Sequence, residues 1–250
     1  MNNLVNQWLQ TIRLSTQSLY QVSRQSLQQQ ARCTCCHDPA LSHPFLCDAC
    51  FPHLPINHPA CVQCAEPLVS LQTGLRCGRC QRRPPAFDYS HCSWQFAAPV
   101  DHWIRLCKDH HDLLWLRRLA HLMNSHPPAQ LAQVDGLVFI PSSRRHLWQR
   151  GFNMAEYLAQ HIARHWGIPI RAHTLYKQHS NDQRGLSAQQ RRLNLRLSLL
   201  SGQQALHGQH LLLIDDVMTT GATLSVAAEH LKQQGARIVG CWCLARTVLR

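Results

Sequence analysis

The stretch Leu211-Leu-Leu-Ile-Asp-Asp-Val-Met-Thr-Thr-Gly-Ala-Thr223 decides the fold of this 250-residue chain. Its four leading apolar residues predict a strand buried on both faces, as in a parallel sheet. Two acids follow at the carboxyl end of that strand. The hydroxyls and the glycine after them lead into a helical pattern at Leu224, and a helix N-terminus of this kind binds phosphate. Because adjacent ribose hydroxyls would donate hydrogen bonds to the two acids, the stretch predicts binding of a ribose 5-phosphate.

The same stretch is similar to the 5-phosphoribosyl-1-pyrophosphate (PRPP) signature of type I phosphoribosyltransferases at every position. The resemblance implies that PRPP is bound by seven residues of it, namely Asp215, Asp216, Thr219, Thr220, Gly221, Ala222 and Thr223. Two other interpretations stay open. The stretch could be a strand, turn and helix with no ligand role, or it could bind a phosphoribosyl group in a protein that catalyses nothing.

The composition excludes several classes of protein. No apolar run approaches the roughly 18 residues of a membrane span, and polar residues interrupt the apolar ones in residues 1–32, unlike in a signal peptide. We therefore expect a cytoplasmic protein. Its 13 cysteines then indicate metal ligands rather than structural disulfides.

The charge balance favours an anionic partner. Lys plus Arg number 25 against 13 for Asp plus Glu, which gives a formal net charge of +12. Nearly all of these cations are arginines, which bind phosphate and stack on bases. Two zinc ions held by four thiolates each would lower the net charge to roughly +8. Nucleotides and nucleic acids are the expected partners.

Eight cysteines form four C-x-x-C pairs between residues 33 and 80. Two such pairs supply the tetrahedral all-thiolate shell of a structural zinc ion, with no position left for catalytic water. Sequence order predicts one site of Cys33, Cys36, Cys47 and Cys50 and a second of Cys61, Cys64, Cys77 and Cys80. An interleaved arrangement and redox dithiols are the alternatives. Cys35 is interpreted as a spare thiol, and Cys241 and Cys243 as small buried residues on one side of a strand.

Strands and helices alternate after the cysteine-rich region. We expect strands at residues 91–97, 137–140, 168–176, 211–214 and 237–244, and helices over residues 100–123, about 154–166 and 224–234. A basic loop at residues 141–153 and a mobile polar loop at residues 177–190 connect them. The pattern predicts an α/β fold with a mainly parallel sheet flanked by helices, which binds ligands at the carboxyl ends of its strands.

From Cys33 onward the chain resembles the ComF family, GntX-type proteins included, which joins a double zinc ribbon to a phosphoribosyltransferase-like domain. Besides the cysteine pairs, the matching segments are Ile140-Pro141 with Arg145, Arg150-Gly-Phe-Asn153, Gln183 with Leu186-Ser187, Arg191 with Asn194, Asp215-Asp-Val-x-Thr-Thr-Gly-x-Thr223 and Trp242-Cys-Leu-Ala-Arg246. Met154 departs from the glutamine that is usual in the family. The resemblance implies a double zinc ribbon at 32–84 and a phosphoribosyltransferase-like domain at 85–250. A helical extension at 1–31, expected from the helical spacing of Leu4, Trp8 and Ile12, lies outside the resemblance.

The resemblance also implies a role in natural transformation or the use of external DNA, with single-stranded DNA and DNA-uptake proteins as partners. Arg145 and Arg150 would neutralise the diphosphate of Mg2+-bound PRPP, and a flexible loop with Gln183, Arg191 and Asn194 would close over it. Two functions stay open. One is a transferase whose acceptor and catalytic residues are unknown. The other is a protein that binds PRPP or single-stranded DNA without catalysis, with Trp148, Phe152 and Trp94 as candidates for base stacking.

Overall fold

The computed structural model describes residues 32–69, 74–177, 199–202 and 205–248. The side chains of Arg144, Arg145, Leu200 and Ser201 lie outside this description, as does the predicted helical extension at residues 1–31. The chain divides into two compact units, with the boundary between Leu54 and Pro55. This boundary falls between the two predicted zinc sites, and the predicted module limits at 32–84 and 85–250 stay a prediction.

In the first unit, the described part is built around cysteine turns. Arg32 forms an antiparallel bridge with Pro39, and the backbone N–H of Cys33 donates to the carbonyl of Asp38 at 2.7 Å. A short 3-10 helix, η1 (Phe51–His53), follows the second cysteine pair. Phe45 and Leu46 are its largest buried apolar side chains. Among the described residues of this unit, Ala40, Leu54 and two of the cysteines are the other buried apolar side chains, so the apolar core that they form is small.

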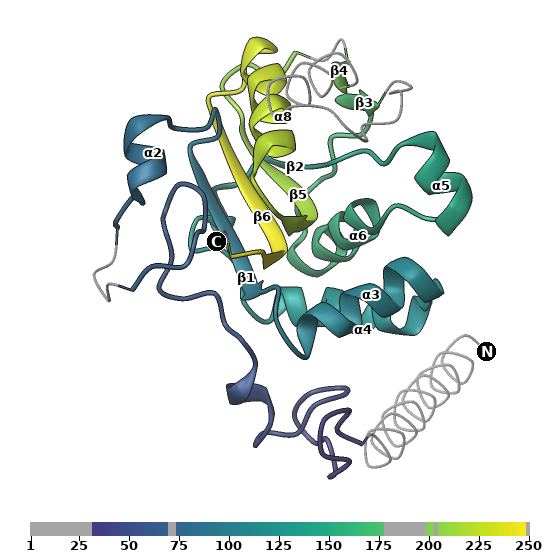
Figure 1. Ribbon diagram of the computed structural model, residues 1–250. Helices are drawn as coiled ribbons and strands as arrows, with labels where there is room; N and C mark the ends of the chain where they lie inside the picture. The colour runs from purple at the N-terminus through teal and green to yellow at the C-terminus, as the bar shows by residue number, and fades with distance from the viewer. Residues whose placement is uncertain (1–31, 70–73, 178–198, 203–204, 249–250) are drawn as a thin grey trace, which may run out of the picture. The chain divides into compact units, whose positions relative to one another are not determined.

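The second unit contains a parallel four-stranded sheet in the order β1 (Tyr89–Gln95), β6 (Ile238–Arg246), β5 (His210–Met218) and β2 (Gly136–Phe139), seen in Figure 1. Every neighbouring pair is parallel. Residues 211–214 of β5 are fully buried between β6 and β2, as the apolar run predicts. The sheet confirms the predicted fold class.

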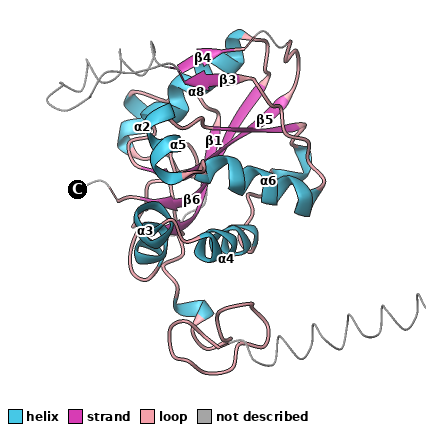
Figure 2. Cartoon of the chain, turned by 90° about the vertical axis from the view of Figure 1, so that its right-hand side faces the viewer, coloured by secondary structure: helices cyan, strands magenta, loops and turns pink. Residues whose placement is uncertain are grey.

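Helices cover both faces of this sheet. Helix α8 (Ala222–Gln233) packs on the face that carries Leu211, Leu213 and Cys241. Helix α6 (Met154–Trp166) contacts β5 and β2, and α4 (Leu113–Asn124) packs beside α6, as Figure 2 shows. Alternate residues of β5 face opposite sides, so its apolar run supplies a core to each layer.

The predicted helix over residues 100–123 is two helices. Helix α3 (Val100–His110) ends because His111 adopts a left-handed conformation with φ 57°. Asp112 then starts α4, since its carboxylate accepts hydrogen bonds from the backbone N–H groups of Leu114 and Trp115. Helical spacing continues across the break, and for this reason periodicity alone did not reveal it.

Two other predictions were incomplete. The basic loop at residues 141–153 contains a helix, α5 (Arg144–Arg150), whose N-cap is Ser143. The predicted strand at 168–176 is reduced to one parallel bridge, between Leu137 and Ile170, followed by β3 (Leu175–Lys177). Strand β3 pairs antiparallel with β4 (Leu199–Ser201). The remaining short elements are α2 (Gly78–Arg82) and η2 (Leu131–Gln133). Within the described ranges, no helix has the length and apolar character needed to cross a membrane.

Candidate ligand and metal sites

The two acids of the signature lie where β5 loses one of its neighbours. Strand β5 continues beyond the predicted end at Ile214 to Met218, because β6 pairs with it as far as Met218 and Arg246. On its other side, β2 pairs with it only to Ile214, and the last hydrogen bond there joins the N–H of Ile140 to the carbonyl of Ile214 at 3.0 Å. Asp215 and Asp216 therefore stand at the carboxyl-end divergence of two parallel strands, where α/β sheets bind ligands.

The immediate surroundings of the acids are charged. Lys108 of α3 forms an ion pair with Asp216, 2.8 Å from Nζ to Oδ2, and both side chains are largely shielded from solvent. The backbone N–H of Asp216 donates to Asp215 Oδ1 at 2.9 Å. Burial raises the pKa of Asp215 to about 7, and the neighbouring carboxylate of Asp216 adds to this effect; the Asp216 N–H, Lys108 and Lys177 act in the opposite direction. Burial lowers the pKa of Lys177, and the negative charge of Asp215 counteracts it.

The loop after β5 leads directly into helix α8. Gly221 has φ +75°, a left-handed conformation that glycine adopts without strain, and it caps the N-terminus of α8. Thr219 and Thr220 are exposed, and Thr220 Oγ1 accepts a hydrogen bond from the N–H of Ala222 at 3.3 Å. Thr223 lies in the first turn of α8. Hydroxyls and helix N–H groups thus meet at one positive helix end, as a phosphate site requires.

The basic segment begins at the carboxyl end of β2, beside the acids. Buried Asn153 holds it in place, because its Nδ2 donates to the carbonyl of Ile140 at 3.0 Å while its Oδ1 accepts from Ser142 Oγ at 3.0 Å. The Asn153 side chain also caps α6. Arg150 ends α5 and is partly exposed, whereas the side chain of Arg145 lies outside the description. Gln183, Arg191 and Asn194 of the predicted closing loop also fall outside the described ranges.

The cysteines meet in two groups, each of which could hold a metal ion. The groups are Cys33, Cys36, Cys47 and Cys50, and Cys61, Cys64, Cys77 and Cys80, with the sulfurs of each group within 4.8 Å of one another. Adjacent pairs make contacts of 3.5 Å from Cys36 to Cys47 and 3.6 Å from Cys64 to Cys77. Sulfurs about 2.3 Å from one zinc ion would be about 3.8 Å apart in a tetrahedron, so the donor sets fit zinc. The sequential arrangement is the one observed, and Cys35 belongs to neither group.

Two domain families match separate parts of the chain. The double zinc ribbon domain matches residues 30–81, and the phosphoribosyl transferase domain matches residues 149–247. DNA utilization protein YhgH of Salmonella typhimurium is 32% identical over 225 residues, which cover 86% of this chain and 97% of that protein. Competence protein F of Haemophilus influenzae is 29% identical over 209 residues, covering 80% and 90% of the two chains. The chain belongs to the ComF family.

Among solved structures, this ComF-family chain resembles the purine phosphoribosyltransferase of Pyrococcus horikoshii with a TM-score of 0.30 and 18% identity, over 59% of this chain and 72% of the other. This likeness is too low to bear on function.

The sequence did not point to Lys108 or Arg246 as residues of the site. Lys108 belongs to a helix inserted after β1, far from the signature in sequence, so no local motif marks it. Arg246 is fully buried and donates to the backbone of both β5 and the second cysteine group. Its only sequence signal is its position in the closing segment Trp242-Cys-Leu-Ala-Arg246.

Buried thiols lie behind the acids in the same sheet. Cys92 of β1 is opposite Cys243 of β6, which in turn is opposite Asp215. Burial raises the pKa of Cys241 and Cys243 well above the usual value. These thiols are therefore protonated, and the interpretation of Cys241 and Cys243 as small buried residues is confirmed.

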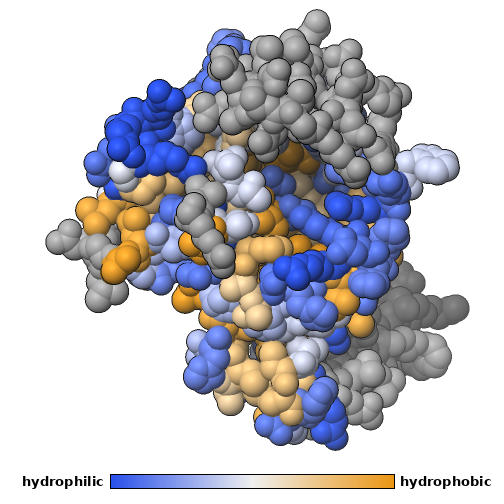
Figure 3. All heavy atoms as spheres, viewed as in Figure 1, coloured by the Kyte–Doolittle hydropathy of each residue, from blue (hydrophilic) through white to orange (hydrophobic). Residues whose placement is uncertain are grey.

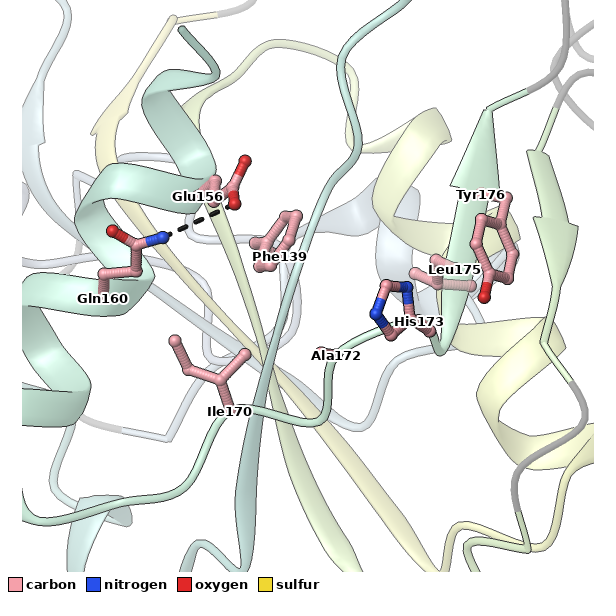
Figure 4. A pocket seen from close by; sticks show the side chains of 8 residues that line it. All are labelled: Phe139, Glu156, Gln160, Ile170, Ala172, His173, Leu175 and Tyr176. Carbon is pink, nitrogen blue, oxygen red and sulfur yellow. Dashed lines mark hydrogen bonds between the residues drawn. The ribbon is translucent and has the colours of Figure 1, made fainter.

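A cavity of about 390 Å³ opens beside β2 and α6. Figure 4 shows the side chains that line it: Phe139, Glu156, Gln160, Ile170, Ala172, His173, Leu175 and Tyr176. Gln160 Nε2 contacts Glu156 Oε1 at 3.4 Å, and the rings of His173 and Tyr176 stack at 6.1 Å. None of these residues belongs to the predicted PRPP site.

Proposed function

We propose that this protein binds PRPP or a related phosphoribosyl compound at the carboxyl end of β5. The observation that carries the proposal is the joint position of the acid pair and the Thr219–Thr220–Gly221 turn at the divergence of β5 and β2. In this arrangement Asp215 and Asp216 accept hydrogen bonds from the ribose hydroxyls. The N-terminus of α8, with Thr220 and Thr223, binds the 5′-phosphate.

Lys108 is the proposed contact for the diphosphate of PRPP. It neutralises Asp216 in the absence of ligand, and a ribose hydroxyl that bonds to Asp216 would compete with it. The released ammonium then lies close to the bound anion, where it complements Arg145 and Arg150. Mg2+ would be carried chiefly by the diphosphate and would reduce its negative charge. The residues of this site hold and screen the ligand, and none of those described is assigned a covalent role.

Zinc in both cysteine groups is part of the same proposal. All-thiolate shells leave no open position, so these ions would stabilise the fold and take no part in chemistry. Metal-binding thiolates persist in reducing compartments, which supports a cytoplasmic location.

The names of the relatives support a role in the use of external DNA, and one structural observation favours binding of single strands. Trp148 of α5 is 92% exposed, between arginines at positions 145 and 150. Hydrophilic residues, blue in Figure 3, cover much of the right-hand side of the second unit, where α5 lies. An exposed indole among arginines suits stacking on unpaired bases. Trp94 is only 1% exposed and is core, which removes it from the stacking candidates.

The proposal is tested by isothermal titration calorimetry of PRPP binding with and without Mg2+. Binding that requires Mg2+ and competes with ribose 5-phosphate is expected. Release of diphosphate on addition of a base or of single-stranded DNA would identify a transferase and its acceptor. Binding without release in any mixture would favour a sensor or DNA-binding protein. Absence of PRPP and ribose 5-phosphate binding would contradict the proposal.

A further inference from the structure

Arg246, at the end of β6, joins the second cysteine group to the loop after β5. Its side chain is completely buried. Toward the cysteine group, Nε donates to the carbonyl oxygen of Cys64 at 3.0 Å and Nη2 pairs with the carboxylate of Glu66. Toward the loop, Nη1 donates to the carbonyl oxygens of Met218, at 3.1 Å, and Thr219. One guanidinium thus contacts Cys64, a candidate metal ligand, and Thr219, the first residue of the Thr219–Gly221 turn.

A second connection joins the same two regions. Gln63 stands between the ligands Cys61 and Cys64, is buried, and donates from Nε2 to the carbonyl oxygen of Phe87 at 2.6 Å. The buried Phe87 ring lies under Gly221, since a Cβ added there would be 3.6 Å from Phe87 Cζ. The backbone N–H of Ala86 also donates to Ser225 Oγ of α8 at 3.0 Å. The turn is therefore supported from the cysteine group at both of its ends.

A buried guanidinium is stabilised only when its donors are satisfied. Here two of the acceptors, the carbonyl of Cys64 and the carboxylate of Glu66, keep their positions only if the Cys61–Cys64 turn is ordered. A metal ion bound by the second cysteine group, to which Cys61 and Cys64 belong, would order that turn. An unordered turn would leave Arg246 without two of its partners and would release Met218 and Thr219 from their present orientation.

We propose that Arg246 is a positioning residue that couples metal at the second cysteine group to phosphate at the Thr219–Gly221 turn. Each ligand then favours the ordered state that the other needs, so the coupling is reciprocal. The inference rests on the proposed function, because it requires that the turn binds a 5′-phosphate. The first cysteine group, in the other compact unit, provides an internal reference.

The test measures zinc release from the wild-type protein to a chromogenic chelator, with ribose 5-phosphate or ribose added. Ribose 5-phosphate should slow the release of one of the two zinc ions by on the order of tenfold, the size of a typical coupling. Ribose without phosphate should have no effect. The slowed ion should be absent from Cys64→Ser and present in Cys36→Ser. Equal release rates with and without bound ribose 5-phosphate would overturn the coupling without any variant having to fold.

The second part of the test is Arg246→Lys, which keeps the charge opposite Glu66 but cannot reach all the acceptors of the guanidinium. It should lower the affinity for ribose 5-phosphate on the order of tenfold and abolish the effect of the sugar phosphate on zinc release. The matched control is Arg237→Gln, immediately before β6, where Nε donates to the carbonyl of Gly208. Unchanged affinity in Arg246→Lys would overturn the positioning role. No ribose 5-phosphate binding by the wild-type protein would instead overturn the proposed function, and this inference with it.

Discussion

The two cysteine groups offer a metal ion the same four sulfurs in different surroundings. In the first, Cys36 is exposed and Cys50 partly exposed, and residues 32–54 around them include few buried apolar side chains. In the second, three cysteines are buried, and the turn between Cys61 and Cys64 contacts Arg246 and, through Gln63, Phe87. The same motif is therefore the core of a small unit in one case and the support of a candidate ligand loop in the other.

The largest expected effect comes from removing one ligand in each group. Cys64→Ser and Cys36→Ser should each lose one of two zinc ions, and a structural zinc site contributes on the order of 10 kcal/mol to folding. Cys64→Ser should also abolish measurable PRPP binding, because the loop after β5 loses its support. Cys36→Ser should bind PRPP within about twofold of the wild type, a change of roughly 0.4 kcal/mol. Elemental analysis and calorimetry measure both quantities. Equal loss of PRPP binding in the two variants would remove the distinction between the groups.

The second prediction tests whether PRPP binding can be weakened at the acids without loss of zinc. Asp215→Ala combined with Asp216→Ala should weaken Mg2+-dependent PRPP binding by about one to three orders of magnitude, at roughly 1.4 kcal/mol per tenfold. Both zinc ions should be retained, since neither acid contacts a cysteine group. The control is Asp101→Ala, which removes an acid that pairs with Arg105 in the first turn of α3. Unchanged affinity in the double variant would mean that the acids do not face the ribose.

The third prediction uses the raised pKa of Asp215, about 7, which results from its burial and from Asp216. Below this pH the carboxyl is protonated and is a poorer acceptor for ribose hydroxyls. Affinity for PRPP should therefore fall as the pH decreases from 7, by up to about tenfold per pH unit. Asp215→Asn should bind weakly and lose this dependence. A flat profile for the wild type, after correction for protonation of PRPP itself, would show that Asp215 is not used in its ionised form.

The last predicted effect is on DNA binding. Trp148→Ala should weaken binding of an oligothymidine single strand by about 1 to 3 kcal/mol, because one base loses its stacking partner. Arg150→Gln should reduce the salt slope by about 0.7 if it contacts one phosphate. Trp166→Ala is the matched control, because Trp166 is another exposed tryptophan, 42% exposed, that lies at the end of α6. If only variants of the first unit affect DNA binding, the DNA site belongs there and not to α5.

Local patterns in the sequence determined much of this protein. Four apolar residues predicted the central strand, the order of the C-x-x-C pairs predicted both cysteine groups, and the acids and the Thr-Thr-Gly turn were expected at the carboxyl end of β5. These features are fixed within a few residues of the chain, where periodicity and the geometry of a tight turn leave few choices. The break at His111 and helix α5 were missed because helical spacing and basic composition do not mark where a helix ends or begins.

Only the tertiary structure decided which distant groups meet. Arg246 donates a hydrogen bond to the carbonyl of Cys64, 182 positions away in the sequence. Lys108 of α3 forms an ion pair with Asp216 of β5. Trp94 and Trp148 are both tryptophans beside polar residues, yet one is core and the other almost fully exposed. Contacts of this kind follow from the register of β6 against β5 and from the helices packed on the sheet. In the unfolded chain each residue can contact many others, so the pattern in one segment does not specify which distant residue it will contact in the folded protein.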